Sequence, residues 1–347
     1  MRWLLDRPAF RDLRFWLIAA ALLVLIVGLL LPKFKMTREV YDIMAFVDIT
    51  ISMNTRDVEI GGETVSRLEA VKTILPKFVA GLPCQSRFGL GIFTERRDFV
   101  LFRPMEVCEN FASIDASIES IDWRMGWDAD SYVTKGVHRA IELAGRLDSS
   151  LMFLTDGHEA PPLPYTGMDP FEGKPGEVKG ILVGVGGYEL SPIPKFDDQG
   201  NEIGVYGPED VLQESRFGMA PPSAKERPGY HPRNNPFGDM VEGNEHLGQV
   251  KEEHLKALAA QTGLDYAHLE NASRLVSEVE RAAQPREVVV DTDVRPYPAA
   301  LALLLLVLLY GLVPLKERFS RKAPASSSGQ FPITIPKIKT KEGFACL

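Results

Sequence analysis

The stretch YDIMAFVDITISMN, residues 41–54, decides both the fold and the candidate site. Residues 41–49 form an apolar run with β-branched side chains, which predicts a strand buried on both faces. At its end Asp48, Thr50 and Ser52 alternate along the chain, so in an extended turn their side chains point the same way. One carboxylate and two hydroxyls at one point suit a hard divalent cation, which prefers oxygen ligands. The plainer interpretation is an Asx or serine turn that caps the next helix.

Strands and helices alternate along the rest of the chain. Apolar residues at helical spacing predict helices at 67–82, 111–121, 132–147, 250–263 and 272–284. Short apolar runs predict further strands at 149–157, 177–187 and 265–270. The runs FGLGIFT and DFVLFRP, joined by a turn at 95–97, predict a hairpin. The predicted fold class is therefore α/β, with a doubly wound, mainly parallel sheet and one antiparallel edge strand. Such a sheet binds ligands beyond the carboxyl ends of its strands.

Two more loops bring polar side chains to the same edge of the predicted sheet. Asp156 follows the strand LMFLT in a Thr-Asp-Gly turn. The segment GWDADS, residues 126–131, leads into the helix predicted from Tyr132, and Ser131 stands at the N-cap of that helix. Asp130 competes with Ser131 as the oxygen ligand from this loop. Three loops that each carry an oxygen donor are a more specific signal of a metal site than any one of them.

This arrangement resembles the metal-ion-dependent adhesion site (MIDAS) of the von Willebrand factor A (VWA) domain family. That family has Asp-x-Ser-x-Ser after its first strand, a Thr before a middle helix and an Asp in a Thr-Asp-Gly turn. The matching residues of this chain are Asp48, Thr50, Ser52, Ser131 and Asp156. Thr stands for Ser at position 50 and Ser for Thr at position 131, and each exchange keeps the hydroxyl. The resemblance covers roughly residues 40–285 and implies a VWA or Rossmann-like fold.

The resemblance also implies a protein that binds a metal and a partner but is not an enzyme. The implied cofactor is a divalent cation, Mg²⁺ in the first place and Ca²⁺ or Mn²⁺ as alternatives. An open position on the cation would take an Asp or Glu carboxylate from a partner protein. Two other functions stay open: a metal-dependent phosphohydrolase with His158 as its base, and a structural anchor with a vestigial metal site. The chain has no Gly-rich phosphate loop of the GxxxxGK type, which speaks against the phosphohydrolase.

The two ends of the chain differ from its middle. Two uncharged apolar runs, 15–32 and 296–315, each approach the ~20 residues that a helix needs to cross a membrane. The segment 1–14 has a net charge of +2 and the tail 316–347 one of +5, while the residues between them carry −15. The positive-inside rule predicts a two-pass bacterial inner-membrane protein with both basic ends in the cytoplasm and the VWA-like domain, 39–292, in the periplasm. A cleaved signal peptide is the alternative for the first run, although no small-residue cleavage signature follows it.

One segment of the predicted domain, 188–248, breaks the alternation of strands and helices. It is rich in Pro, Gly, Asn and charge, and its stretch FDDQGNEIGVY predicts a turn between two short strands. The overall layout is similar to that of bacterial membrane-anchored A-domain proteins of the aerotolerance-operon type and of those that accompany MoxR-type ATPases, including accessory proteins of methanol oxidation. This likeness implies a role in the assembly or maturation of a periplasmic or membrane complex, with a MoxR-type ATPase system as a candidate partner. The net charge of −8 argues against a nucleic acid as partner.

The cysteines give one further expectation. Three cysteines without CxxC spacing exclude a disulfide scaffold and a structural zinc knuckle. Cys84 precedes FGLGIFT and Cys108 follows DFVLFRP, so the predicted hairpin would bring both to its open end. A disulfide and two free thiols both stay open for this pair.

Overall fold

The structure is a computed structural model of the 347-residue chain, and it describes residues 13–30, 34–126, 130–163, 167–208, 210–211 and 244–312. Several predictions from the sequence lie outside these residues. They concern the segment 1–12, residues 31–32 and 313–315 of the two apolar runs, and residues 127–129 of the second loop. They also concern most of the Pro/Gly-rich segment (212–243) and the basic tail 316–347. The chain divides into a central body, Thr37–Val289, and a second unit formed by its two ends.

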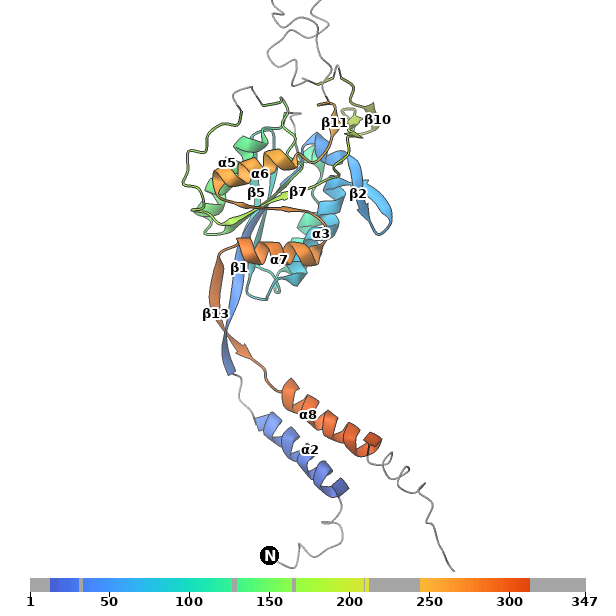
Figure 1. The fold of residues 1–347 in the computed structure, drawn as a ribbon, viewed down its shortest axis with the longest axis vertical. Helices are drawn as coiled ribbons and strands as arrows, with labels where there is room; N and C mark the ends of the chain where they lie inside the picture. Colours follow the sequence, from blue (N-terminus) through green and yellow to red (C-terminus); the bar gives the residue numbers. More distant parts are fainter. Residues whose placement is uncertain are drawn as a thin grey trace, which may run out of the picture. The chain divides into compact units, whose positions relative to one another are not determined.

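The central body is built on one seven-stranded sheet (Figure 1). Six strands lie in the order β12-β7-β6-β1-β4-β5, and β13 (Pro285–Thr292) pairs with β1. The six are β1 (Phe34–Asp48), β4 (Arg87–Thr94), β5 (Arg97–Glu106), β6 (Ser150–Thr155), β7 (Gly180–Gly184) and β12 (Asp265–His268). The pairs along this order are parallel except β4–β5, which is antiparallel. The predicted mainly parallel sheet with one antiparallel edge strand is therefore confirmed.

The strand order places the candidate site. From β1 the chain builds outward on one side through β4 and β5, then returns and builds on the other side through β6, β7 and β12. The carboxyl ends of β1 and β6 therefore meet where the direction reverses, which is the position at which doubly wound sheets bind their ligands. The register sets Val47 opposite Leu154, so the loops that begin at Asp48 and Asp156 start side by side.

Helices cover both faces of the sheet. One layer holds α3 (Arg67–Gly81), α4 (Phe111–Glu119) and α7 (Ala272–Ala282), and the other holds α5 (Val133–Arg146) and α6 (Glu252–Thr262) (Figure 1). The strand β1 supplies both cores because its side chains alternate between the faces. Ile43 and Val47 pack with the first layer, whereas Met44 and Phe46 pack with the second. The unbroken apolar run in the sequence follows from this double burial.

Short antiparallel strand pairs lie in the loops at the carboxyl edge of the sheet. The predicted turn between two strands is confirmed as β9 (Pro194–Phe196) and β10 (Glu202–Val205), which pair antiparallel. The pair β8 (Ser191–Pro192) and β11 (Leu247–Gly248) closes the base of the Pro/Gly-rich segment. A further hairpin, β2 (Arg56–Ile60) and β3 (Glu63–Ser66), joins the first loop to α3, and the sequence did not predict it.

The terminal unit contains two apolar helices. They are α2 (Leu13–Leu30) and α8 (Pro296–Val307), the latter followed by a π-helical turn at Leu308–Leu312. They pack closely at Gly28, where a Cβ atom would lie 2.8 Å from Cγ of Pro298. Across the described residues, no helix combines the length and the apolar character needed to cross a membrane. The two predicted membrane spans stay predictions.

Candidate metal centre

The first loop folds back on the carboxylate of Asp48 at the end of β1. Oδ1 of Asp48 accepts hydrogen bonds from the amide (2.9 Å) and hydroxyl (2.7 Å) of Thr50, and Oδ2 accepts one from the Thr155 hydroxyl (2.6 Å). The Thr50 and Ser52 hydroxyls lie 3.4 Å apart, so the three alternating side chains do converge. The Asx turn of the plainer interpretation is present, but it caps no helix, because Ser66 caps α3.

The third loop supplies a second buried carboxylate, that of Asp156. Its Oδ1 accepts a hydrogen bond from the amide of His158 at 2.9 Å, and its Oδ2 lies 2.5 Å from Nη1 of Arg67. Arg67 is fully buried and also binds Asp57, with Nε 3.0 Å from Oδ1 and Nη2 2.5 Å from Oδ2. Asp57, Arg67 and Asp156 thus form a buried acid–base–acid chain behind the first loop. An arginine in the first turn of a helix is usually solvent-exposed, so this role of Arg67 could not be predicted from the sequence.

Glycine makes room for the Arg67 guanidinium. Gly186 has φ +122°, and a Cβ atom at this position would lie 2.4 Å from Nε of Arg67. A Cβ atom at Gly248 would lie 3.1 Å from Nη2 of the same side chain. Two glycines from distant parts of the chain therefore border the arginine, which shows that the surrounding backbone is shaped around it.

Backbone hydrogen bonds join the second loop to the third loop and to the turn between β4 and β5. Ser131 and Ala160 exchange two N–H···O bonds of 2.7 Å each, and the amide of Tyr132 donates to the Glu95 carbonyl at 2.6 Å. Ser131 is only 2% exposed, and its hydroxyl has no hydrogen-bond partner within the described part of the chain. A buried hydroxyl without a partner is costly, so it marks a place where a ligand atom is expected.

The predicted N-cap role of Ser131 is wrong. Tyr132 holds the N-cap position of α5 and makes no side-chain cap. Instead, the carboxylate of Glu159, which belongs to the third loop, caps the start of α5. Its Oε1 accepts hydrogen bonds from the amide (2.8 Å) and the hydroxyl (2.6 Å) of Thr134. Because the capping group comes from another loop, the Ser131 hydroxyl is left for the site.

A cavity of about 280 Å³ opens onto these loops, and we call it the metal-site cavity. The hydroxyl-bearing residues Thr50, Ser52 and Ser131 line it, together with Asp130, the alternative ligand of the second loop. Asp48 and Asp156 do not line the cavity and are fully buried beneath it. A cation in this place would meet the three hydroxyls and Asp130 first, with the carboxylates of Asp48 and Asp156 behind them.

Two ionised carboxylates buried side by side, those of Asp48 and Asp156, are electrostatically unfavourable without a cation. Burial, and next the negative charge of Asp156, raise the pKa of Asp48 to about 7, against the lowering effect of its hydrogen bonds from Thr155 and Thr50. Burial also lowers the pKa of His158, which lines the cavity. A divalent cation near the hydroxyls would offset the repulsion between the two acids. The residues present therefore fit an oxygen-bound divalent cation.

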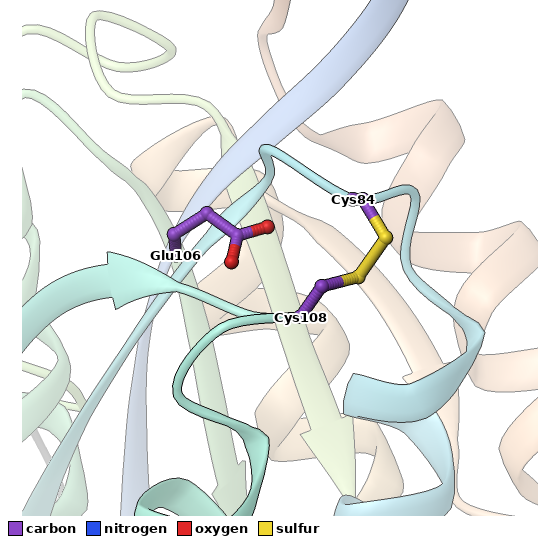
Figure 2. A group of neighbouring side chains, drawn as sticks. All are labelled: Cys84, Glu106 and Cys108. Carbon is purple, nitrogen blue, oxygen red and sulfur yellow. A yellow bond between two sulfur atoms is a disulfide. The ribbon is translucent and has the colours of Figure 1, made fainter.

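A second group of potential metal ligands occurs at the open end of the β4–β5 hairpin (Figure 2). It consists of Cys84, Glu106 and Cys108, but the two sulfur atoms are joined in a disulfide with a Cα–Cα distance of 5.3 Å. The Glu106 carboxylate accepts a hydrogen bond from the amide of Gln85 at 2.6 Å. The disulfide that the sequence left open is thus present, and bonded sulfurs do not serve as thiolate ligands.

Comparison with known proteins gives only distant likenesses. No protein-family model matches the chain, and no curated protein matches it. Among solved structures, it is similar to an aerotolerance-related membrane protein from Bacteroides fragilis (16% identity, TM-score 0.43, 70% of this chain and 98% of that one). The conserved hypothetical protein BatB from Bacteroides thetaiotaomicron gives 17% identity and a TM-score of 0.43 over the same shares of the two chains. A von Willebrand factor type A protein from Catenulispora acidiphila gives 10% identity and a TM-score of 0.36, over 77% of this chain and 49% of that one.

Proposed function

We propose that this protein binds a partner protein through a divalent cation held in a VWA-type MIDAS. One observation carries the proposal. Hydroxyls from two loops line one cavity above two buried carboxylates, at the reversal point of a doubly wound sheet, and the Ser131 hydroxyl has no partner among the described residues. Oxygen donors of this kind suit Mg²⁺ best, with Ca²⁺ and Mn²⁺ as alternatives.

The candidate ligands would bind the cation in two ways, directly and through water. Thr50, Ser52 and Ser131 would hold it directly, with Asp130 as the rival of Ser131. Asp48 and Asp156 would act through water, because both are fully buried beneath the cavity and do not line it. A cation among neutral ligands stays electrophilic, and it therefore attracts a carboxylate from outside. The carboxylate of a partner Asp or Glu is the external ligand that we propose for this cation.

We infer binding without chemical turnover. A phosphohydrolase would need a carboxylate or His158 placed to attack or to move a proton. Both oxygens of Asp48 accept hydrogen bonds from threonines, and Nε2 of His158 lies 3.9 Å from Oε2 of Glu245. The engaged oxygens of Asp48 support recognition rather than a reaction at this site.

We further propose that the body lies on the periplasmic side of a bacterial inner membrane, with both chain ends in the cytoplasm. The disulfide Cys84–Cys108 supports this side, because such bonds persist mainly in oxidising compartments. The basic ends around an acidic middle support the same orientation. Assembly or maturation of a periplasmic or membrane complex, in concert with a MoxR-type ATPase system, is the role that we assign to the partner binding.

The test uses the purified full chain and two matched variants. Asp48→Ala should lose bound Mn²⁺ or Mg²⁺, measured by calorimetry and elemental analysis, and should lose chelator-sensitive capture of partner proteins. Asp42→Ala removes the same side chain from the same strand, where it pairs with Arg286, and should keep both properties. Asp48→Asn, with a melting curve, separates loss of the site from loss of the fold. Unchanged cation binding in the folded Asp48 variants would refute the metal site and leave a structural anchor.

A further inference from the structure

The segment between β7 and α6 builds one wall of the metal-site cavity. Ile193, Tyr206 and Val211 contribute the side chains of this wall, which we call the insert wall. Further apolar lining comes from Ile51 in the first loop and Pro161 in the third. The cavity therefore combines the hydroxyls of the candidate ligands with a group of apolar side chains.

Contacts with the body hold the insert wall in place. The ring of Phe196 packs on Trp123 with centroids 4.6 Å apart, and the carboxylate of Glu202 accepts two hydrogen bonds from Arg56. Within the wall, the amide of Tyr206 donates to the carbonyl of Ile193 at 3.0 Å. Both contacts with the body lie between Ile193 and Tyr206 in the chain, and a wall held in this way can discriminate between ligands by shape.

Burial limits what can reach the candidate ligands. Thr50, Ser52 and Ser131 are 4%, 6% and 2% exposed. A broad protein face cannot contact atoms buried to this degree, whereas a narrow group that enters the cavity can. A volume of about 280 Å³ is at the small end of ligand pockets, which span roughly 300–1,000 Å³, so it suits one or two residues or a small organic acid.

The charge of the lining adds a second condition. The acidic residues of the cavity are Asp130, Glu159, Asp210 and Glu245, and among its described lining residues there is no lysine or arginine. From outside the lining, Lys195 pairs with Asp210 at 2.6 Å and Lys251 lies 3.9 Å from Glu245, so part of this charge is offset. The other acids would repel an entering carboxylate, and a bound cation would offset that repulsion. We therefore expect binding of an acid in this cavity to require the metal.

We propose that the metal-site cavity selects a carboxylate that carries an apolar body, and that Ile193, Tyr206 and Val211 determine this specificity. The inference rests on the proposed function, because the cation supplies the attraction for the acid. The carboxylate meets the cation while the apolar part packs on the insert wall. A free small acid, the carboxyl end of a partner chain and an acidic side chain beside an apolar one on a partner loop share this chemistry.

The first experiment measures small probes on the purified full chain with saturating Mg²⁺. Phenylacetate should bind at least tenfold more tightly than acetate, and phenylacetamide, which lacks the charge, should not bind. Removal of the cation with a chelator should abolish phenylacetate binding. The methyl signals of Ile193 and Val211 in NMR spectra should shift when phenylacetate is added. Equal affinity for acetate and phenylacetate would overturn the inference.

Peptide probes then distinguish the sources of the acid. Three hexapeptides are compared: one with a free C-terminal Leu, its amide, and one with an internal Asp-Leu pair and blocked ends. Preference for the free C-terminus supports capture of a chain end, and preference for the internal pair supports capture of a loop. Binding of phenylacetate alone supports a free acid as ligand. Metal-independent binding of all three peptides would contradict the inference.

Two valine substitutions in the same segment provide the matched control. Val211→Gln should weaken phenylacetate binding about tenfold, because one apolar contact in a pocket is worth about this factor, and should leave Mg²⁺ affinity unchanged. Val205, which is 53% exposed and does not line the cavity, should tolerate the same change without effect. If both variants bind phenylacetate equally while Mg²⁺ still binds, only the specificity inference fails. If Mg²⁺ does not bind the unmodified chain, the proposed function fails and takes this inference with it.

Discussion

Replacement of Arg67 by Met tests the buried acid–base–acid chain that supports the candidate site. The substitution keeps a long side chain but leaves the carboxylates of Asp57 and Asp156 without their shared counter-charge. Breaking a buried ion pair by removing one partner costs about 3–5 kcal/mol. In a domain of this size each kcal/mol shifts the melting temperature by about 2–4 °C, so we expect a fall of roughly 6–20 °C.

Arg286→Met is the control for this prediction. Arg286 also makes two hydrogen bonds to an aspartate, Asp42, but its side chain is 38% exposed, so its loss should cost at most about 1 kcal/mol. Differential scanning calorimetry of the three proteins in a chelating buffer measures both shifts. Addition of Mg²⁺ should raise the melting temperature of the Arg67 variant more than that of the unmodified chain, because the cation replaces part of the lost positive charge beside Asp156. Equal melting temperatures for the Arg67 and Arg286 variants would refute the reasoning.

Two further outcomes follow from the same region. Gly186→Ala should destabilise the protein by about 1–3 kcal/mol more than Gly204→Ala in urea unfolding, since both glycines have positive φ but only the first would press its Cβ against Arg67. A similar loss for the two variants would show that backbone strain alone matters. The raised pKa of Asp48, about 7 against an ordinary 3.8, means that the folded protein keeps a proton that the unfolded chain has released. Without a cation, this group should therefore make the free energy of unfolding fall as the pH rises from 5 to 7, and Asp48→Asn should remove that part of the dependence.

The sequence predicted the features that local pattern and strand order determine. The apolar run before Asp48 marks a strand buried on both faces, and parallel topology brings its carboxyl end beside that of the strand before Asp156. Asp48, Thr50 and Ser52 could therefore be grouped with Asp156 before any coordinates were known. The helices and the hairpin followed from apolar periodicity and turn residues.

Features that depend on contacts between distant segments escaped the sequence. The burial of Arg67 depends on Asp57, Asp156 and the absence of a Cβ at Gly186. No sequence pattern around Arg67 shows that these residues come together in the fold. Ser131 matched the pattern of an N-cap residue, but a carboxylate from another loop took that role. The insert wall could not be predicted because turn-rich composition shows where a loop lies and not what it covers.

The backbone pairing of the second loop with the third loop and with the β4–β5 turn has a consequence for the strength of binding. Ser131 is hydrogen-bonded through its main chain to Ala160, and Tyr132 through its amide to Glu95, so the second loop can hardly shift without its neighbours. A receptor whose groups already stand in their bound arrangement loses little conformational freedom when it captures a ligand. Most of the attraction between the cation and the acid then contributes to the affinity. The site can therefore bind even a short acidic segment that makes few other contacts.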